Sequence, residues 1–165
     1  MNLLELFKPI NTFIFEIEGV LADNVVSLNE TGGMLHYLHS RDIFALQTAL
    51  SKGYKLWFIA SGKDEWLTEW HDKGVHIVNR DNNNPQEILQ SIQSGTDYRN
   101  ILYAGADMPA LSLMKDHWLP VCPADAVPEI KKLAKYISPS AGGNGCVRDV
   151  IEKVLKLNGH WQFPA

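Results

Sequence analysis

The sequence predicts an α/β fold with a mainly parallel β-sheet, helices on both faces and a protruding β-hairpin. Short apolar, β-branched runs alternate with segments of helical periodicity, which is the pattern of a parallel sheet covered on both faces. Two apolar segments that flank a glycine turn are typical of a hairpin. The chain has 165 residues, of which 45% are hydrophobic, and no repeat or linker-like stretch divides it. We therefore expect one domain over residues 1–165.

The first expected elements are a buried strand and the hairpin. Residues Thr12–Ile17 are apolar, β-branched and aromatic, as in a strand buried on both faces. The hairpin strands are expected over Val25–Leu28 and Leu35–Leu38, inside an insert that covers about residues 24–40. The turn Asn29–Gly33 between them ends in two glycines, which suit a tight reversal.

The rest of the chain alternates between helix and strand. The expected helices cover Arg41–Lys52, Asp64–Lys73, a segment opened by Asn84-Pro85-Gln86-Glu87, Pro109–Lys115, Ala126–Lys135 and Cys146–Leu157. The expected strands cover Tyr54–Ala60, His76–Val78, Asn100–Ala104 and Leu119–Cys122. Ligands of parallel sheets bind outside the carboxyl ends of the strands, so the loops that follow the strands are expected to surround any site.

Composition argues against several classes of partner. The net charge of −4 offers no concentrated basic face for a nucleic acid. No stretch approaches the roughly 20 apolar residues that span a bilayer, and Glu5, Lys8 and Pro9 interrupt any signal-peptide core. The two cysteines are too few for a disulfide framework. We expect a soluble protein of the cytoplasm, without nucleic-acid or membrane partners.

Two loops carry candidate functional groups. Glu16 and Glu18 follow the first strand at i and i+2, so both carboxylates project in the same direction. Such a pair can hold a divalent cation or divide nucleophilic and acid/base work, although it can also be two charged residues at a strand end. Ser61-Gly62 follows the second long strand, and a hydroxyl with free amides there suits phosphate binding. A simple helix cap is the alternative for Ser61.

The segment Glu16-Ile-Glu18-Gly-Val-Leu-Ala-Asp23 resembles the opening motif Asp-x-Asp-Gly-Val-Leu-x-Asp of haloacid-dehalogenase-like (HAD) phosphatases. The hairpin and the run from Gly142 to Asp149 resemble elements of one group in that superfamily, the 3-deoxy-D-manno-octulosonate (KDO) 8-phosphate phosphatases. The resemblance covers about residues 12–161. It implies a capless, Rossmann-like HAD domain.

The resemblance also assigns roles to positions in this sequence. It makes Glu16 the nucleophile position and Glu18 the acid/base position, with glutamate in place of aspartate at both. The phosphate-binding positions are Ser61, Gly62 and Asn84, where Asn84 replaces a lysine. Arg80 is the one cation in that loop, and we do not expect it to replace the lysine.

Magnesium is the cofactor that the resemblance implies. Its ligands would come from Glu16, Glu18 and Asp107, but Ala106 stands where the family has a metal-binding aspartate. We therefore expect a weak or absent Mg²⁺ site. A helix cap explains Asp107 equally well.

Four positions, 16, 18, 84 and 106, depart from the family pattern. We expect an impaired or inactive phosphatase relic with a binding, structural or regulatory role, a direction also taken by the phosphatase-like tail of some CMP-sialic acid synthetases. The alternative is an active Mg²⁺-dependent sugar-phosphate phosphatase that uses Glu16 as nucleophile. The hairpin implies a homotetramer, and a sugar-acid phosphate is a candidate ligand.

Overall fold

The computed structural model of the chain describes residues 2–62, 64–95, 100–114 and 118–164. The strands of its main sheet are β1 (Thr12–Glu16), β4 (Lys55–Ala60), β5 (His76–Asn79), β6 (Ile101–Ala104), β7 (Leu119–Cys122) and β8 (Tyr136–Ile137). They lie in the order β5-β4-β1-β6-β7-β8, and every neighbouring pair is parallel. This sheet confirms the predicted α/β fold.

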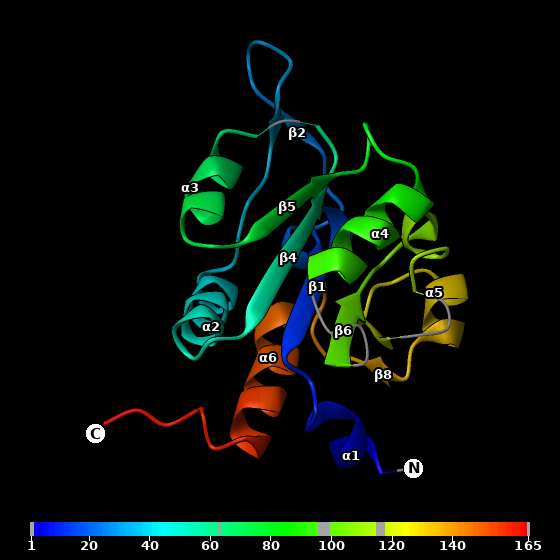
Figure 1. Cartoon of the computed structure of the whole chain (residues 1–165). Coiled ribbons are helices and arrows are strands. Elements are labelled where there is room, and N and C mark those ends of the chain that lie inside the picture. The colour runs from blue at the N-terminus through cyan, green and yellow to red at the C-terminus, as the bar shows by residue number, and fades with distance from the viewer. Residues whose placement is uncertain (1, 63, 96–99, 115–117, 165) are drawn as a thin grey trace.

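Helices cover both faces of the sheet (Figure 1). They are α1 (Leu3–Phe7), α2 (Ser40–Ser51), α3 (Trp66–Asp72), α4 (Pro85–Gly95), α5 (Pro128–Leu133) and α6 (Cys146–Leu157), with the short turns η1 (Ile17–Leu21) and η3 (Met108–Ala110). Helix α6 packs against α2 and α1. Its apolar stripe is fully buried, and it spans the residues that the sequence predicted. Within the described residues, no helix has the length and apolar character needed to cross a bilayer.

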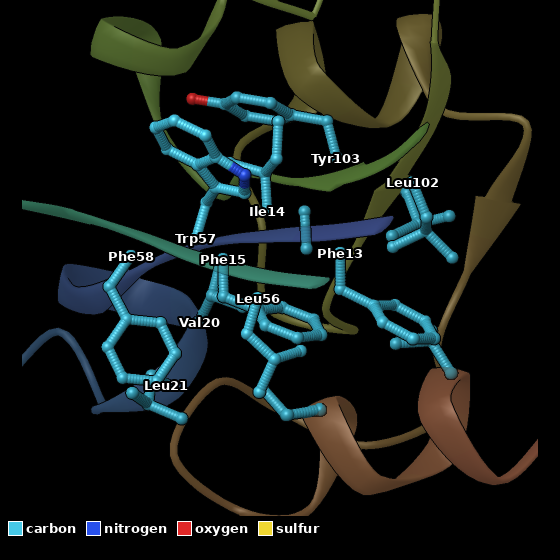
Figure 2. Close-up of a cluster of buried hydrophobic side chains, with 14 of the residues drawn as sticks. Phe13, Ile14, Phe15, Val20, Leu21, Leu56, Trp57, Phe58, Leu102 and Tyr103 are labelled. Carbon is cyan, nitrogen blue, oxygen red and sulfur yellow. The ribbon is translucent and has the colours of Figure 1, made fainter. Parts of the chain in front are cut away.

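Alternating side chains of the central strands form the core (Figure 2). Because successive residues of a strand face opposite sides of the sheet, β1 supplies apolar groups to both layers. The side that faces α6 takes Phe13, Phe15, Leu56 and Phe58, and the opposite side takes Ile14, Trp57 and Tyr103. Strands β1 and β6 are buried along their whole length and β4 from Leu56 to Ala60, which fixes where the loops at their carboxyl ends lie.

The hairpin protrudes beyond the carboxyl end of the sheet (Figure 1). Its antiparallel strands are β2 (Ser27–Leu28) and β3 (Met34–Leu35), so the predicted hairpin is confirmed but its strands are shorter. The side-chain oxygen of Asn29 accepts hydrogen bonds from the amides of Thr31 and Gly33, and these bonds close the turn.

Two predicted helices differ from the structure. The prediction of a helix over Pro109–Lys115 is wrong, because η3 covers only Met108–Ala110. The amides of Leu113 and Met114 both donate to the Ala110 carbonyl, and these bonds form turns rather than a longer helix. Lys115 lies outside the described residues. The helix expected over Ala126–Lys135 is shortened to α5, which begins at Pro128.

Candidate active site

Four loops at the carboxyl ends of neighbouring strands form the candidate site. Glu16 is the last residue of β1, and Ser61 directly follows β4. Arg80 follows β5, and Gly105 follows β6. Because these strands are adjacent in the sheet, their loops are adjacent too. This arrangement agrees with the prediction that the loops after the strands surround any site.

The first and fourth loops lie in close contact. A Cβ atom added at Gly19 would lie 2.9 Å from the Cβ of Ala106 and 2.6 Å from the side-chain oxygen of Asn24. Only glycine fits here without displacing its neighbours. The contact places Ala106, where the resemblance implies a metal-binding aspartate, directly beside the loop that carries the two glutamates.

Glu16 is at the centre of a buried polar cluster. The residue is 3% exposed, and its Oε1 accepts a 2.6 Å hydrogen bond from the Tyr103 hydroxyl. The same oxygen accepts a hydrogen bond from the guanidinium of Arg80. Burial raises the pKa of Glu16, while Arg80 and Tyr103 oppose that rise. The carboxylate therefore depends on these two donors to remain charged.

Tyr103 is the donor that sequence reasoning missed. It is fully buried in β6 and stacks on Trp118, with 5.5 Å between ring centroids. Burial raises the pKa of its phenol well above the ordinary value, and the neighbouring Glu16 carboxylate raises it further. The hydroxyl is thus a neutral donor. A tyrosine inside an apolar strand was the available signal, because a buried tyrosine hydroxyl usually has a hydrogen-bond partner.

Arg80 contacts Glu16 directly. Its guanidinium forms an ion pair with the Glu16 carboxylate. Its side chain is 23% exposed, so the pair is shielded from water for the most part. The structure thus places a cation beside Glu16, supplied by the loop after β5. The expectation that Arg80 does not replace the missing family lysine stays a prediction.

Glu18 has different partners from Glu16. Its Oε1 lies 3.5 Å from Nε2 of His36 in the hairpin, and it accepts a 3.4 Å hydrogen bond from the Ser61 amide. Nδ1 of His36 lies 2.7 Å from the Asp64 carboxylate. The two glutamates are close enough that Glu18 raises the pKa of Glu16. Within the described residues, however, no three His, Cys, Asp or Glu side chains are grouped so that they could hold a metal ion.

The Ser61-Gly62 turn faces the loop after β5. The Gly62 amide donates a 2.6 Å hydrogen bond to the Asp81 carboxylate, and the Gly62 carbonyl accepts a 2.5 Å hydrogen bond from the side chain of Asn79. Gly62 has a φ of 76°, a conformation that glycine adopts without strain. The amide of this turn thus already has an anionic partner.

Asn84 and Asp107 have clear structural roles. The side-chain oxygen of Asn84 accepts a 3.0 Å hydrogen bond from the Glu87 amide, and the Asn84 amide donates to the Glu87 carboxylate at 2.8 Å. This reciprocal capping box begins α4 and confirms the cap predicted there. Asp107 accepts a 2.7 Å hydrogen bond from the Met108 amide and caps η3, as the structural alternative proposed. A role of Asn84 in phosphate binding stays a prediction.

Comparison with known proteins supports the resemblance. No family model matches the chain. The 3-deoxy-D-manno-octulosonate 8-phosphate phosphatase of Salmonella typhi is 27% identical over 158 residues, which cover 92% of this chain and 82% of that protein. The chain is therefore similar in sequence and in fold to HAD phosphatases of the KDO 8-phosphate phosphatase group.

Two further proteins are similar to this KDO 8-phosphate phosphatase-like protein, one in structure and one in sequence. The crystal structure of the Moraxella catarrhalis KDO 8-phosphate phosphatase, in complex with magnesium, phosphate and KDO, has a TM-score of 0.79 at 23% identity. The structural match covers 93% of this chain and 90% of the Moraxella catarrhalis chain. An N-acylneuraminate cytidylyltransferase of Oncorhynchus mykiss is 23% identical over 91% of this chain, which corresponds to 37% of that longer protein. Sequences similar to this chain therefore occur both as a whole phosphatase and as part of a longer protein.

Proposed function

We propose that this KDO 8-phosphate phosphatase-like protein does not hydrolyse phosphate esters and acts instead through binding or assembly. The observation that carries the proposal is the pairing of Glu16 with Arg80 and Tyr103. A carboxylate nucleophile must present an oxygen lone pair to phosphorus. Two donors on Oε1, one of them charged, withdraw electron density from the Glu16 carboxylate and hold it in place.

The charge balance of the site supports the same proposal. Phosphoryl transfer depends on positive charge that neutralises the developing anion. In this chain the guanidinium of Arg80 is already paired with Glu16. Mg²⁺ requires several oxygen ligands in near-octahedral geometry, and Ala106 contributes none where the family supplies a carboxylate. These residues do not fit a magnesium site, so no catalytic step is assigned to the metal.

A comparison of the wild-type protein with Glu16→Gln tests the proposal. Glutamine keeps the length of the side chain and can still accept hydrogen bonds, so the buried cluster is preserved while the nucleophile is lost. Both proteins, with Mg²⁺, should release no more phosphate from KDO 8-phosphate or an aryl phosphate than a protein-free control. The Salmonella typhi phosphatase, assayed in parallel, shows that the assay works. Wild-type turnover that disappears in Glu16→Gln would favour the active-phosphatase alternative.

We also propose that the protein assembles through its hairpin into a homotetramer. Five large apolar side chains on and around the hairpin are between 41% and 69% exposed, namely Val25, Val26, Leu28, Leu35 and Tyr37. A two-stranded hairpin is marginally stable alone, and its strand edges carry unpaired backbone groups. Contact between four hairpins would cover both the apolar surface and the edges.

We place this role in the cytoplasm. Cys122 and Cys146 are free, and burial of both thiols supports a reducing compartment in which no disulfide is needed. Burial raises the pKa of the Cys122 thiol to about 11, so it is protonated and unreactive at neutral pH.

A further inference from the structure

The amide of Gly62 is paired with an anion that the chain itself supplies. Oδ2 of Asp81 lies 2.6 Å from the Gly62 nitrogen. Asn79 holds the two loops together, because its side-chain nitrogen donates to the Gly62 carbonyl and its side-chain oxygen accepts a 2.8 Å hydrogen bond from the Asp81 amide. The two hydrogen bonds of the Asn79 side chain therefore hold the Asp81 carboxylate opposite the Gly62 amide.

This arrangement fills the position that an external anion would need. Backbone amides at a tight turn attract oxyanions such as phosphate or a carboxylate. A carboxylate oxygen and a phosphate oxygen are equivalent acceptors for such an amide, and charged acceptors form the shorter and stronger hydrogen bonds. The neighbouring Ser61 amide is also directed at a carboxylate, that of Glu18, although at the longer distance of 3.4 Å.

We propose that Asp81 determines the specificity of this site by occupying the anion position of the Ser61-Gly62 turn and thereby excluding phosphate esters. The inference rests on the proposed function, because it concerns the same site. Entry of a phosphate would require the Gly62–Asp81 hydrogen bond to break and would bring two like charges together. A sugar-acid phosphate therefore does not engage the Gly62 amide of the wild-type protein.

Titration of ¹⁵N-labelled protein with inorganic phosphate tests the role of Asp81. The probe is the Gly62 amide resonance, with sodium chloride added to hold ionic strength constant. In the wild-type protein this resonance should not move. In Glu18→Gln it should also not move, because Asp81 still occupies the amide. In the double variant Glu18→Gln/Asp81→Ala it should shift saturably, with phosphate binding at least about tenfold tighter than in the wild-type protein.

The matched control is Glu18→Gln/Asp72→Ala. It removes an exposed aspartate of α3 and has the same net charge as the test variant, so a gain of phosphate binding in both would show a general charge effect and overturn the inference. If the alanine variant does not give a dispersed spectrum, Glu18→Gln/Asp81→Gly replaces it, because glycine also removes the acceptor from the Gly62 amide, and it should show the same gain.

Three further outcomes would overturn the inference. They are a wild-type Gly62 resonance that responds as strongly as the double variant, a full response in Glu18→Gln alone, and a folded double variant that does not respond. Because the titration reads occupancy by inorganic phosphate, its failure leaves the proposed function intact. That proposal fails only if the wild-type protein releases phosphate from an ester.

Discussion

Removal of the Arg80 charge should destabilise the protein in a pH-dependent way. The variant Arg80→Met keeps the apolar part of the side chain and leaves Glu16 buried with Tyr103 as its one described donor. Breaking a buried ion pair by removing one partner costs about 3–5 kcal/mol. Because about a quarter of the Arg80 side chain is in contact with solvent, we expect a loss near the lower end, about 3 kcal/mol at pH 8.

The pKa of the Glu16 carboxyl determines whether the loss of stability in Arg80→Met grows or shrinks with pH. Burial raises its pKa in the folded protein, and loss of Arg80 removes the largest of the effects that oppose this rise. Below the ordinary glutamate pKa of about 4.3, Glu16 is protonated with or without Arg80, and the variant loses little. As the pH rises, Glu16 ionises in the unfolded chain before it ionises in the folded variant. The free energy of unfolding of the variant therefore falls, by at most about 1.4 kcal/mol per pH unit, until the pH passes the pKa of Glu16 in the folded protein.

Urea unfolding between pH 5 and pH 8 measures this difference. Lys73→Met is the control, because it removes an exposed i,i+4 partner of Glu69 and should cost no more than about 0.5 kcal/mol at any pH. The double variant Glu16→Gln/Arg80→Met should recover much of the lost stability, since no unpaired charge remains buried. A pH-independent loss in Arg80→Met, or one no larger than in the control, would refute the assigned pairing.

Four other outcomes are expected. Glu16→Asp alone should lower the unfolding free energy by about 1–3 kcal/mol in urea, because the shorter side chain leaves buried donors unpaired, whereas unchanged stability would show that the cluster tolerates the shorter acid. Asn84→Ala should cost about 1 kcal/mol in the same assay through loss of the α4 cap, and a cost near zero would contradict the capping box. The melting temperature should be the same in Mg²⁺ and in EDTA, and a rise that follows the Mg²⁺ concentration would show that a site exists. Light scattering should give the mass of a tetramer for the wild-type protein and for the control Thr31→Glu, which changes the turn of the hairpin. Leu28→Glu/Leu35→Glu should give a smaller mass, and a monomer mass for the wild-type protein would rule out the assembly.

The sequence predicted the long elements well because each carries a strong local signal. Helix α6 was placed to the residue, since its apolar positions recur at helical spacing and Asn158-Gly159 follows it. The five-residue α1 and the two-residue β8 were missed, because segments of that length show no periodicity. The helix expected after Pro109 was reduced to the short turn η3, which shows that a few apolar residues after a proline do not determine a helix.

The loops of the site were predictable, but the partners of their side chains were not. The topology of a parallel sheet places the loops after β1, β4, β5 and β6 together whatever their sequence. Which donor reaches Glu16 depends on contacts across 64 and 87 positions of the chain, with Arg80 and Tyr103 respectively. Tyr103 had the pattern of a core residue, and it is also one, since its ring is buried while its hydroxyl serves the site.

Glu16 does more than occupy the position that the resemblance assigns to a catalytic aspartate. Its Oε1 is the common acceptor for a buried phenol and a guanidinium, and both donors would be left without it in a dry environment. An aspartate in the same backbone position would end on the order of 1 Å short of them. The glutamate therefore fits its present partners, and the positive charge of Arg80 is paired with the Glu16 carboxylate within the chain. Because the acid and its donors are adapted to one another, restoring single family residues should damage this cluster before it restores catalysis.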